Sequence, residues 1–350
     1  LPPINEWSAT FPPMLPTRER VSLRNPDTSE KIAKSFLYGK LTRTDQPKIV
    51  IEAFPGPGSL SRGLLVLPPS KLAKLIILED HEPYLNYLRP LEEADPRVKV
   101  IPMSGFLWTT YSALDEMGIL NDVDTVPWDS GIHPNLHFIS HLPQSIHGEQ
   151  FVAQLLRCIP ERSWLFKYGR VPMSLVLGDW VWRRMSSGIN GAERCKLSVI
   201  TEAVSDSSLS VPPSTLLPYE DHLHPIKHYA TIDPKRKPDP RRYGHPLVAT
   251  NLVPLQDQCI DKGKLDQWDF ILRRLFVLKS TPLKTAISSL APGAQVLLKA
   301  LTSPDLPESQ RVDTGKTVRN LSVSDWTLFA RAFDEWPFAP EVCPIPRLPC

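Results

Sequence analysis

A glycine-containing turn in the first quarter of the chain has the residue types of an anion- or nucleotide-binding loop. The stretch KIVIEAFPGPGSLSRGLL, residues 48–65, runs from an apolar, β-branched segment through Glu52, Gly56 and Gly58 into a short helical segment. Glycines let a ligand approach the backbone, and the first N–H groups of a helix have no partner within that helix. The turn therefore suggests a nucleotide-type cofactor, although an ordinary strand-to-helix turn would also fit the loop taken alone.

The turn lacks the G-x-G-x-x-G spacing of dinucleotide sites. Residues 52–58, EAFPGPG, instead resemble the E-x-G-x-G-x-G turn of S-adenosylmethionine-dependent methyltransferases. Glu79 ends a second apolar segment, where those enzymes have an acid that binds the ribose hydroxyls. The third apolar segment ends within VKVIPMSGF, and the fourth ends within FISHLPQSI. This order and spacing, over residues 25–190, resembles the rRNA adenine dimethyltransferase (KsgA-type) family.

The catalytic motif of that family is Asn-Leu-Pro-Tyr or a close variant. Its amide and a backbone carbonyl accept hydrogen bonds from the adenine amino group, and its aromatic residue stacks on the flipped base. The four matching positions here are His141, Leu142, Pro143 and Gln144. An imidazole replaces the amide acceptor and an amide replaces the stacking ring, so we expect no catalytic residue in this motif.

The cofactor positions depart from the family pattern as well. Phe54 stands at the first glycine of the turn, where a bulky side chain crowds the cofactor. Ser104 stands where the family usually has the acid that reaches the adenine of the cofactor. The resemblance leaves these candidates for a vestigial cofactor site: Glu52, Gly56, Gly58, Glu79 and Ser104. We expect that no cofactor is required, while S-adenosylmethionine binding stays possible.

Further strings resemble fungal mitochondrial transcription factor B, a family of methyltransferase-like initiation factors. They are SWLFKYGRVPMSLVL, AERCKLSVITEAVSD, QWDFILRRLFVLKSTPLKTAISSLAPGAQ and FARAFDEWPFAP. The resemblance implies a monomeric protein of the mitochondrial matrix that assists the single-subunit mitochondrial RNA polymerase in melting promoter DNA, with RNA as a further possible ligand. The alternative is a mitochondrial small-subunit rRNA adenine N6,N6-dimethyltransferase that uses S-adenosylmethionine. A ribosome-assembly or RNA-binding module without promoter activity is a third hypothesis.

Two aromatic and several basic residues are the candidates for nucleic-acid binding. Phe106 and Trp108 follow the third apolar segment, and in the transcription factor family the matching loop captures unstacked non-template bases. Filling a vacated cofactor pocket is their alternative role. Basic clusters contact phosphates and make binding salt-dependent, although each alone is also typical of a solvated face. The basic candidates are Arg183, Arg184, Lys235, Arg236, Lys237, Arg241, Arg242, Arg273 and Arg274.

Strand-type segments alternate with helical ones, which predicts a parallel sheet covered on both faces. The predicted strands are 48–53, 74–78, 98–102, 136–140 and 171–177, and a helix over 29–38 is predicted to be capped by Thr28 or Ser29. With the resemblance, the expected fold is a Rossmann-like α/β methyltransferase fold with a small C-terminal helical domain. The predicted parts are a Pro-rich arm (1–28), the α/β domain (29–260) with a Pro-rich, basic loop insertion (205–246), the helical domain (261–338) and a flexible Pro-rich tail (339–350).

The composition narrows the possible classes of protein. Hydrophobic residues make up 41% of the chain, enough for a substantial core, and the net charge of +2 does not by itself indicate a nucleic-acid binder. No apolar run approaches the roughly 18 residues of a membrane span, and the N-terminal residues have no signal-peptide or transit-helix pattern. The five cysteines form no CxxC pair, and no recognised spacing completes the histidines of the insertion, so we expect no metal site.

Overall fold

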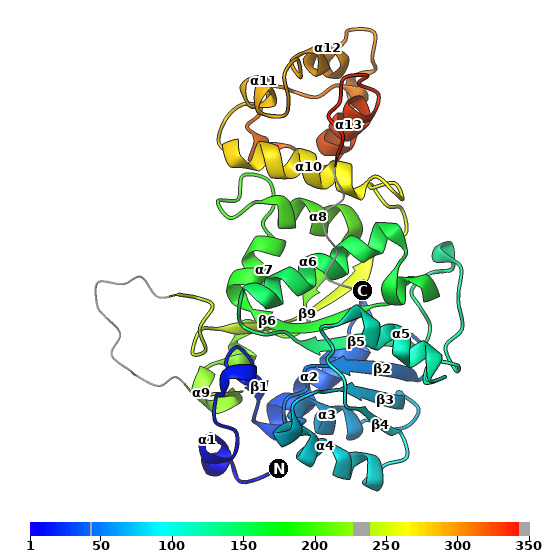
Figure 1. Ribbon diagram of the computed structural model, residues 1–350, viewed down its shortest axis with the longest axis vertical. Coiled ribbons are helices and arrows are strands. Elements are labelled where there is room, and N and C mark those ends of the chain that lie inside the picture. The colour runs from blue at the N-terminus through cyan, green and yellow to red at the C-terminus, as the bar shows by residue number, and fades with distance from the viewer. Residues whose placement is uncertain (43, 227–238, 343–350) are drawn as a thin grey trace, which may run out of the picture.

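The computed structural model describes residues 1–42, 44–226 and 239–342. Figure 1 shows the sheet and its helices in the lower part of the molecule and the C-terminal helices stacked above them. Three of the basic candidates, Lys235, Arg236 and Lys237, lie outside the described residues. So do residues 343–350 of the predicted tail.

A seven-stranded sheet forms the centre of the larger part. Its strands are β2 (Lys48–Ala53), β3 (Leu72–Leu78), β4 (Val98–Ile101), β5 (Leu136–His141), β6 (Met173–Gly178), β7 (Ser205–Leu209) and β9 (Leu247–Pro254). Their order is β4-β3-β2-β5-β6-β9-β7, with the first five parallel and β9 antiparallel to both of its neighbours. Because β2 pairs with β3 on one side and β5 on the other, the crossover direction changes at β2. In open α/β sheets ligands bind outside the carboxyl ends of the strands at such a point.

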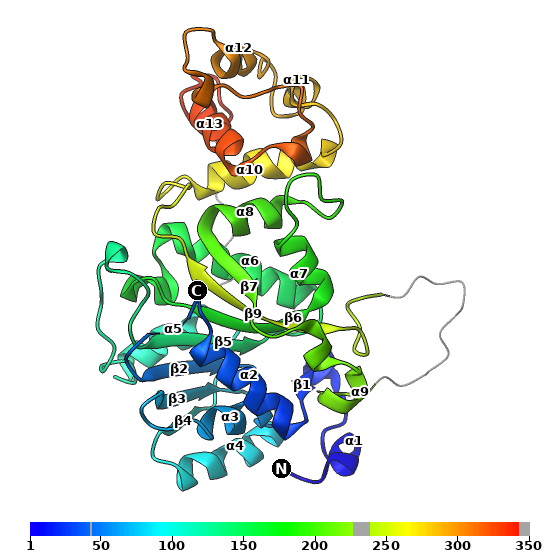
Figure 2. The same ribbon diagram turned by 180° about the vertical axis from the view of Figure 1, so that it is seen from behind.

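Helices cover both faces of the sheet, as Figures 1 and 2 show. The face with α2 (Pro26–Tyr38), α3 (Ser59–Leu65) and α4 (Glu82–Ala94) has its own hydrophobic cluster. The opposite face carries α5 (Trp108–Glu116), α6 (Ile146–Glu161), α7 (Asp179–Met185) and α8 (Lys196–Val204). Val50 belongs to the first cluster and its neighbour Ile51 to the second, because successive strand side chains point to opposite faces.

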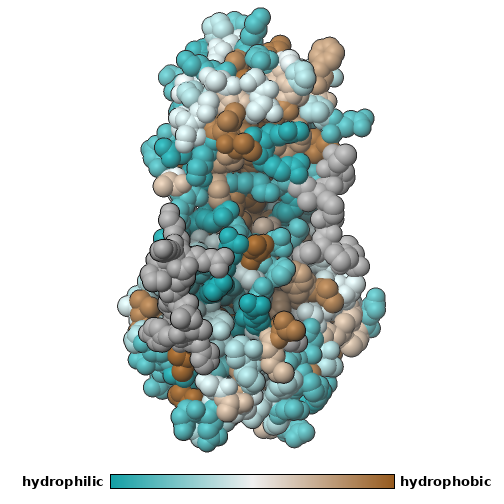
Figure 3. All heavy atoms as spheres, turned by 60° about the vertical axis from the view of Figure 1, so that its left-hand side comes forward, coloured by the Kyte–Doolittle hydropathy of each residue, from teal (hydrophilic) through white to brown (hydrophobic). Residues whose placement is uncertain are grey.

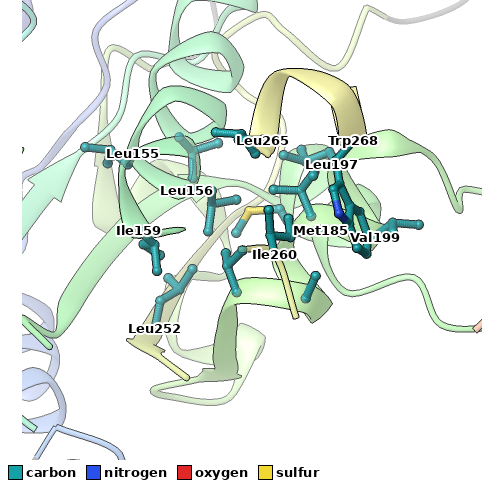
Figure 4. Packing of buried hydrophobic residues seen from close by; sticks show 14 of the residues in the cluster. Leu155, Leu156, Ile159, Met185, Leu197, Val199, Leu252, Ile260, Leu265 and Trp268 are labelled. Carbon is teal, nitrogen blue, oxygen red and sulfur yellow. The ribbon is translucent and has the colours of Figure 1, made fainter. Parts of the chain in front are cut away.

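The C-terminal helices share a core with the sheet domain. They are α10 (Leu265–Leu275), α11 (Leu283–Ala286), α12 (Val296–Thr302) and α13 (Val323–Asp334). One cluster of buried side chains runs from the sheet through α6 and α8 into these helices. Figure 4 shows Leu265 and Trp268 of α10 beside Leu156 of α6 and Leu197 of α8.

The shorter elements complete the described chain. The 3-10 helices are η1 (Ile4–Glu6), η2 (Leu15–Thr17), η3 (Trp128–Ser130), η4 (Trp164–Tyr168), η5 (Pro213–Leu216), η6 (Phe276–Leu278), η7 (Ile287–Ser289), η8 (Glu308–Gln310) and η9 (Val318–Asn320). The short helices α1 (Trp7–Thr10) and α9 (Tyr219–His222) and the two-residue strands β1 (Ser22–Leu23) and β8 (Leu223–His224) lie in the N-terminal arm and the insertion.

The structure corrects three details of the sequence analysis. Helix α2 begins at Pro26, inside the predicted arm, and its cap is Asn25 rather than Thr28 or Ser29. The Asn25 Oδ1 accepts from the Thr28 N–H at 3.1 Å. The insertion is not all loop, because it begins with strand β7, whose polar sequence SDSSL hides the apolar alternation of a strand. Strand β9 was also missed, although it is buried throughout and joins β6 to β7.

The N-terminal arm packs against the sheet domain. Trp7 and Phe11 are buried, at 1% and 3% exposure. The Phe11 ring lies 5.0 Å from that of Tyr87 on α4, and the Trp7 ring lies 5.6 Å from that of His224, between ring centroids. Strand β1 of the arm pairs antiparallel with β8 of the insertion. Two segments that looked like separate appendages in the sequence therefore form one small layer over the sheet domain.

Trp268→Ala should test the shared core between the two parts. Trp268 is 3% exposed, and truncating a buried Trp to Ala typically costs about 3–5 kcal/mol of unfolding free energy. Chemical denaturation should show that loss as a single lower midpoint for the whole chain. The matched control is Val277→Ala on η6, where the side chain is 81% exposed, and a change within about 0.5 kcal/mol is expected. Equal effects of the two changes would contradict a shared core.

Candidate functional site

The turn after β2 has an unusual backbone. Phe54, Gly56 and Gly58 all have positive φ, at 58°, 61° and 86°. A Cβ on Gly56 would lie 2.1 Å from the Ser22 Oγ, so glycine is required where the arm approaches the turn. A positive φ is unfavourable for Phe54, because its Cβ is crowded in this conformation, whereas glycine adopts it freely. Its ring is only 9% exposed, and it packs edge-on against Phe151 at 5.7 Å between centroids.

Glu79, the candidate ribose-binding acid, is bound by a residue that sequence reasoning missed. Arg20 of the arm donates from Nη1 to Glu79 Oε1 at 2.7 Å and from Nη2 to Oε2 at 2.5 Å. The Glu79 side chain is fully buried and that of Arg20 is 10% exposed. Glu79 Oε1 also accepts from the backbone N–H groups of Asp80 and His81, at 3.1 and 3.0 Å. Although burial lowers it, the pKa of Arg20 is raised overall by the charge and hydrogen bonds of Glu79, so the guanidinium stays charged.

Glu52, the acid at the start of the turn, is buried without a cation bonded to it. Its Oε2 accepts from the Ser61 hydroxyl on α3 at 2.6 Å, while Oε1 has no hydrogen-bond partner among the described residues. Burial raises the pKa of Glu52 to about 7, against the smaller opposing effect of the Ser61 hydrogen bond, and the nearby charge of Glu79 adds to the rise. The carboxyl therefore holds its proton below neutral pH.

Both altered residues of the degenerate motif at the end of β5 are buried, and Gln144 is hydrogen-bonded to the insertion. His141 is 4% exposed, and burial, with a smaller contribution from Arg20, lowers its pKa to about 3, so the imidazole is neutral. Gln144 is 2% exposed, and its amide Nε2 donates to the carbonyls of Pro240 and His245, each at 3.3 Å. Its backbone N–H donates to the Glu19 carbonyl of the arm at 2.7 Å. The amide that replaces the stacking ring therefore serves to hold the end of the insertion.

The two candidate aromatics stack on one buried ring. Phe106 and Trp108 lie 5.5 and 6.0 Å from Phe151 of α6, between centroids, with interplanar angles of 27° and 20°. Trp108 also meets Trp164 edge-on at 5.7 Å. Both residues are half-buried, so each leaves part of its side chain at the surface. Ser104 precedes them, and its carbonyl accepts from the Thr110 hydroxyl at 2.7 Å. This arrangement is compatible with both base stacking and filling of the pocket.

The basic candidates do not gather at one place. Arg183 on α7 pairs with Asp179 at 2.9 Å, and Arg184 pairs with Glu149 of α6 at 3.0 Å. Arg241 and Arg242 are exposed at the end of the insertion. Arg273 and Arg274 are exposed on α10.

The residues at the carboxyl ends of β2 and β3 do not fit S-adenosylmethionine. Both oxygens of Glu79, which would accept from the ribose hydroxyls, already accept from Arg20. Gly56, where the backbone would face the ligand, faces Ser22. No sequence pattern indicated Arg20 or Ser22, because they lie in an arm without a motif.

Among the described residues, no group of three or more histidines, cysteines and acids could hold a metal ion. In that same part of the chain no helix is long and apolar enough to span a membrane.

Arg20→Ala should destabilise the fold strongly. Removing one partner of a buried ion pair leaves an uncompensated charge, which typically costs about 3–5 kcal/mol. Thermal and urea unfolding at neutral pH should both show the loss. The control is Arg89→Ala, which removes the exposed pair with Glu82 and should leave the midpoint unchanged within error. A midpoint for Arg20→Ala equal to that of the control would contradict the role given to the pair.

Glu52→Gln should remove part of the pH dependence of stability. The folded pKa of about 7 lies above the ordinary 4.5, so between these values the folded state holds a proton that the unfolded state has released. Stability from this group is therefore full at low pH and falls as the pH rises toward 7, by roughly 1–3 kcal/mol. The unfolding free energy of Glu52→Gln minus that of the wild type should be larger at pH 8 than at pH 5, measured by urea unfolding. Exposed Glu308→Gln should track the wild type, and identical pH profiles for all three proteins would refute the assignment.

Comparisons with known proteins fit this architecture. The ribosomal RNA adenine dimethylase family matches residues 23–334. The chain is 26% identical to mitochondrial transcription factor 1 of Saccharomyces paradoxus, over 91% of this chain and 89% of that protein. The Saccharomyces cerevisiae protein of the same name is 27% identical over the same shares. Dimethyladenosine transferase 1, mitochondrial, of Caenorhabditis elegans is 24% identical over 89% of this chain and 76% of that one.

Solved structures confirm the predicted fold class. A dimethyladenosine transferase from Plasmodium falciparum superposes with a TM-score of 0.55 at 16% identity, covering 90% of this chain and 98% of that one. The 23S rRNA methyltransferase ErmE superposes with a TM-score of 0.51 at 14% identity, covering 90% and 100%. The mitochondrial names of the sequence relatives support a mitochondrial location. Because the family model matches residues 23–334 and the fold agrees with it, this chain belongs to the ribosomal RNA adenine dimethylase family.

Proposed function

We propose that this protein is a mitochondrial transcription initiation factor that uses a methyltransferase fold without methyl-transfer chemistry. The observation that carries the proposal lies at the end of β5, where His141, the last residue of the strand, and Gln144 stand in place of the catalytic groups of the family. The similarity to mitochondrial transcription factor 1 over about nine-tenths of the chain supports the same function. In this proposal the partners are the mitochondrial RNA polymerase and promoter DNA, and the location is the matrix.

The chemistry of the site supports a binding role. Adenine N6 methylation needs an acceptor for the amino group and a flat ring beneath the base. A neutral, buried His141 has one acceptor nitrogen in a different position from an Asn amide. The side chain of Gln144 is held by the carbonyls of Pro240 and His245. Neither residue can replace the group that the reaction requires.

Strand capture is the function that we assign to Phe106 and Trp108. Both lie on the connection between β4 and the start of α5, at the carboxyl end of the sheet. Stacking of a base on an aromatic side chain is worth about 1–3 kcal/mol, and opening one base-pair step costs about 1.4 kcal/mol on average. A few such contacts therefore offset the melting of a few base pairs. The stack on Phe151 holds both rings in place before DNA arrives.

Phosphate contacts would come from basic residues spread over the surface. Arg242, Arg273 and Arg274 are exposed. Arg241 is exposed as well and pairs with Asp239 at 3.6 Å, while Arg183 and Arg184 pair with Asp179 and Glu149. Figure 3 shows hydrophilic side chains around the middle of one face, with isolated hydrophobic ones between them. Such a spread supports a modest, salt-dependent DNA footprint that is completed by the polymerase.

The test is run-off transcription with the cognate mitochondrial RNA polymerase on duplex and pre-melted promoters. Addition of this protein should increase the yield on the duplex and change it little on the pre-melted template. Equal yields on the duplex with and without the protein would contradict the proposal. An increase of the same size on both templates would point to an RNA- or template-binding role that does not involve melting.

The alternative function is a mitochondrial rRNA adenine N6,N6-dimethyltransferase. The family name and the similarity to dimethyladenosine transferase 1 favour it, and Glu52 and Glu79 are the acids that it would keep. Incubation with labelled S-adenosylmethionine and a small-subunit rRNA hairpin tests this directly. Transfer of label to adenine would establish the alternative, and its absence together with duplex-dependent transcription would support the initiation factor.

Trp108→Ala should weaken promoter opening. Loss of one stacking contact of about 1–3 kcal/mol lowers the ratio of open to closed complex roughly 5- to 150-fold, measured by 2-aminopurine fluorescence in the melted region. The neighbouring change Leu107→Ala, at a side chain that is 44% exposed, should leave opening unchanged. Thermal unfolding of both variants separates loss of stacking from loss of fold. Wild-type opening by a folded Trp108→Ala protein would rule out the capture role of this ring.

A further inference from the structure

One segment of the N-terminal arm, Glu19–Leu23, crosses the carboxyl ends of three strands. The Glu19 carbonyl accepts from the backbone N–H of Gln144, after β5. Arg20 pairs with Glu79, after β3, and Ser22 lies against Gly56, after β2. The segment therefore contacts all three loops around the crossover point, where folds of this type bind their ligands.

The Arg20 side chain presents the hydrogen-bonding pattern of a sugar diol. A ribose that binds a carboxylate donates two parallel O–H groups to its two oxygens. A guanidinium donates two parallel N–H groups in the same bidentate arrangement, and more strongly because of its charge. Arg20 does so at 2.7 and 2.5 Å. Its guanidinium carbon also lies 5.5 Å from the Phe54 ring centroid and 5.1 Å from that of Tyr84, so the cation lies between two rings.

Ser22 and the strand around it fix this position of the arm. Ser22 is 4% exposed and pairs with His224 in the register of β1 and β8. The next backbone N–H, of Arg24, donates to the His222 carbonyl at 2.9 Å. Further toward the N-terminus, the buried rings of Trp7 and Phe11 anchor the arm on α4 and β8. The segment is therefore held from both of its ends.

We propose that residues 19–22 are a built-in occupant of the cofactor cleft, with Arg20 in the place of the cofactor ribose. The arm, and not only the altered turn, excludes nucleoside cofactors from this chain. The proposal does not depend on the promoter function, because it concerns only what fills the cleft. It predicts that a cofactor analogue gains access when Arg20 of the arm is replaced with alanine in a protein whose Phe54 is replaced with glycine.

The rival explanation is that Phe54 alone blocks the cleft. Phe54→Gly separates the two, because glycine suits a φ of 58° and removes the ring. The proteins to compare are the wild type, Phe54→Gly, Phe54→Gly with Arg20→Ala, and Phe54→Gly with Arg89→Ala. The last is a matched control that removes an exposed arginine paired with Glu82 on the same helix, away from Glu79. The probe is S-adenosylhomocysteine, measured by titration calorimetry and by the shift in Tm.

Only the variant that lacks both Phe54 and Arg20 should bind the probe. With a Kd near 0.1 mM, its Tm should rise by roughly 2–4 °C at 1 mM probe, while the other three proteins should show no shift. Binding by the wild type, by Phe54→Gly or by the Arg89 control would overturn the proposal, since the arm would then not exclude the cofactor. A folded double variant without binding would overturn it too. If that variant does not fold, Phe54→Gly still decides: no binding supports an occupied cleft, and binding refutes it.

Discussion

Two carboxylates lie at the carboxyl ends of adjacent strands, and burying them is the constraint that shapes the surrounding structure. A buried carboxylate needs either a cation with good geometry or its own proton. Glu79 has the first, from Arg20, and Glu52 has the second below neutral pH. The arm that carries Arg20 is in turn fixed by Trp7 and by β8, so a site at the centre of the sheet depends on residues at the start of the chain and in the insertion.

The backbone fold and the side chains at the ends of its strands point to different functions. The strand order and the two helical layers are those of a methyltransferase fold, while His141 and Gln144 stand at the positions that match the catalytic motif of the family. Fold alone does not imply function, because function resides in particular side chains. Here the same strand ends that would hold a cofactor and a base hold an arginine, a neutral histidine and a stack of aromatic rings.

Much of the fold followed from the sequence, because the apolar parallel strands, buried on both faces, leave a clear pattern, whereas the buried antiparallel strand β9 was missed. β2 begins and ends at the predicted residues. β7 and the helix cap at Asn25 were missed, since a polar edge strand has no apolar alternation and several capping residues stood close together. The acids and the degenerate motif were identified from spacing. Arg20 could not be, because its role arises from a contact across 59 residues of sequence and no local pattern encodes it.

The continuous core that joins the sheet to the C-terminal helices has a mechanical consequence. Trp108 rests on Phe151 of α6, and α6 packs on α10, which carries Arg273 and Arg274. The distance between Trp108 and the arginines of α10 is therefore fixed by the packing of the folded protein. In the proposed function, a nucleic acid that contacts both adapts to that fixed distance, and the energy of any deformation is borne by the nucleic acid.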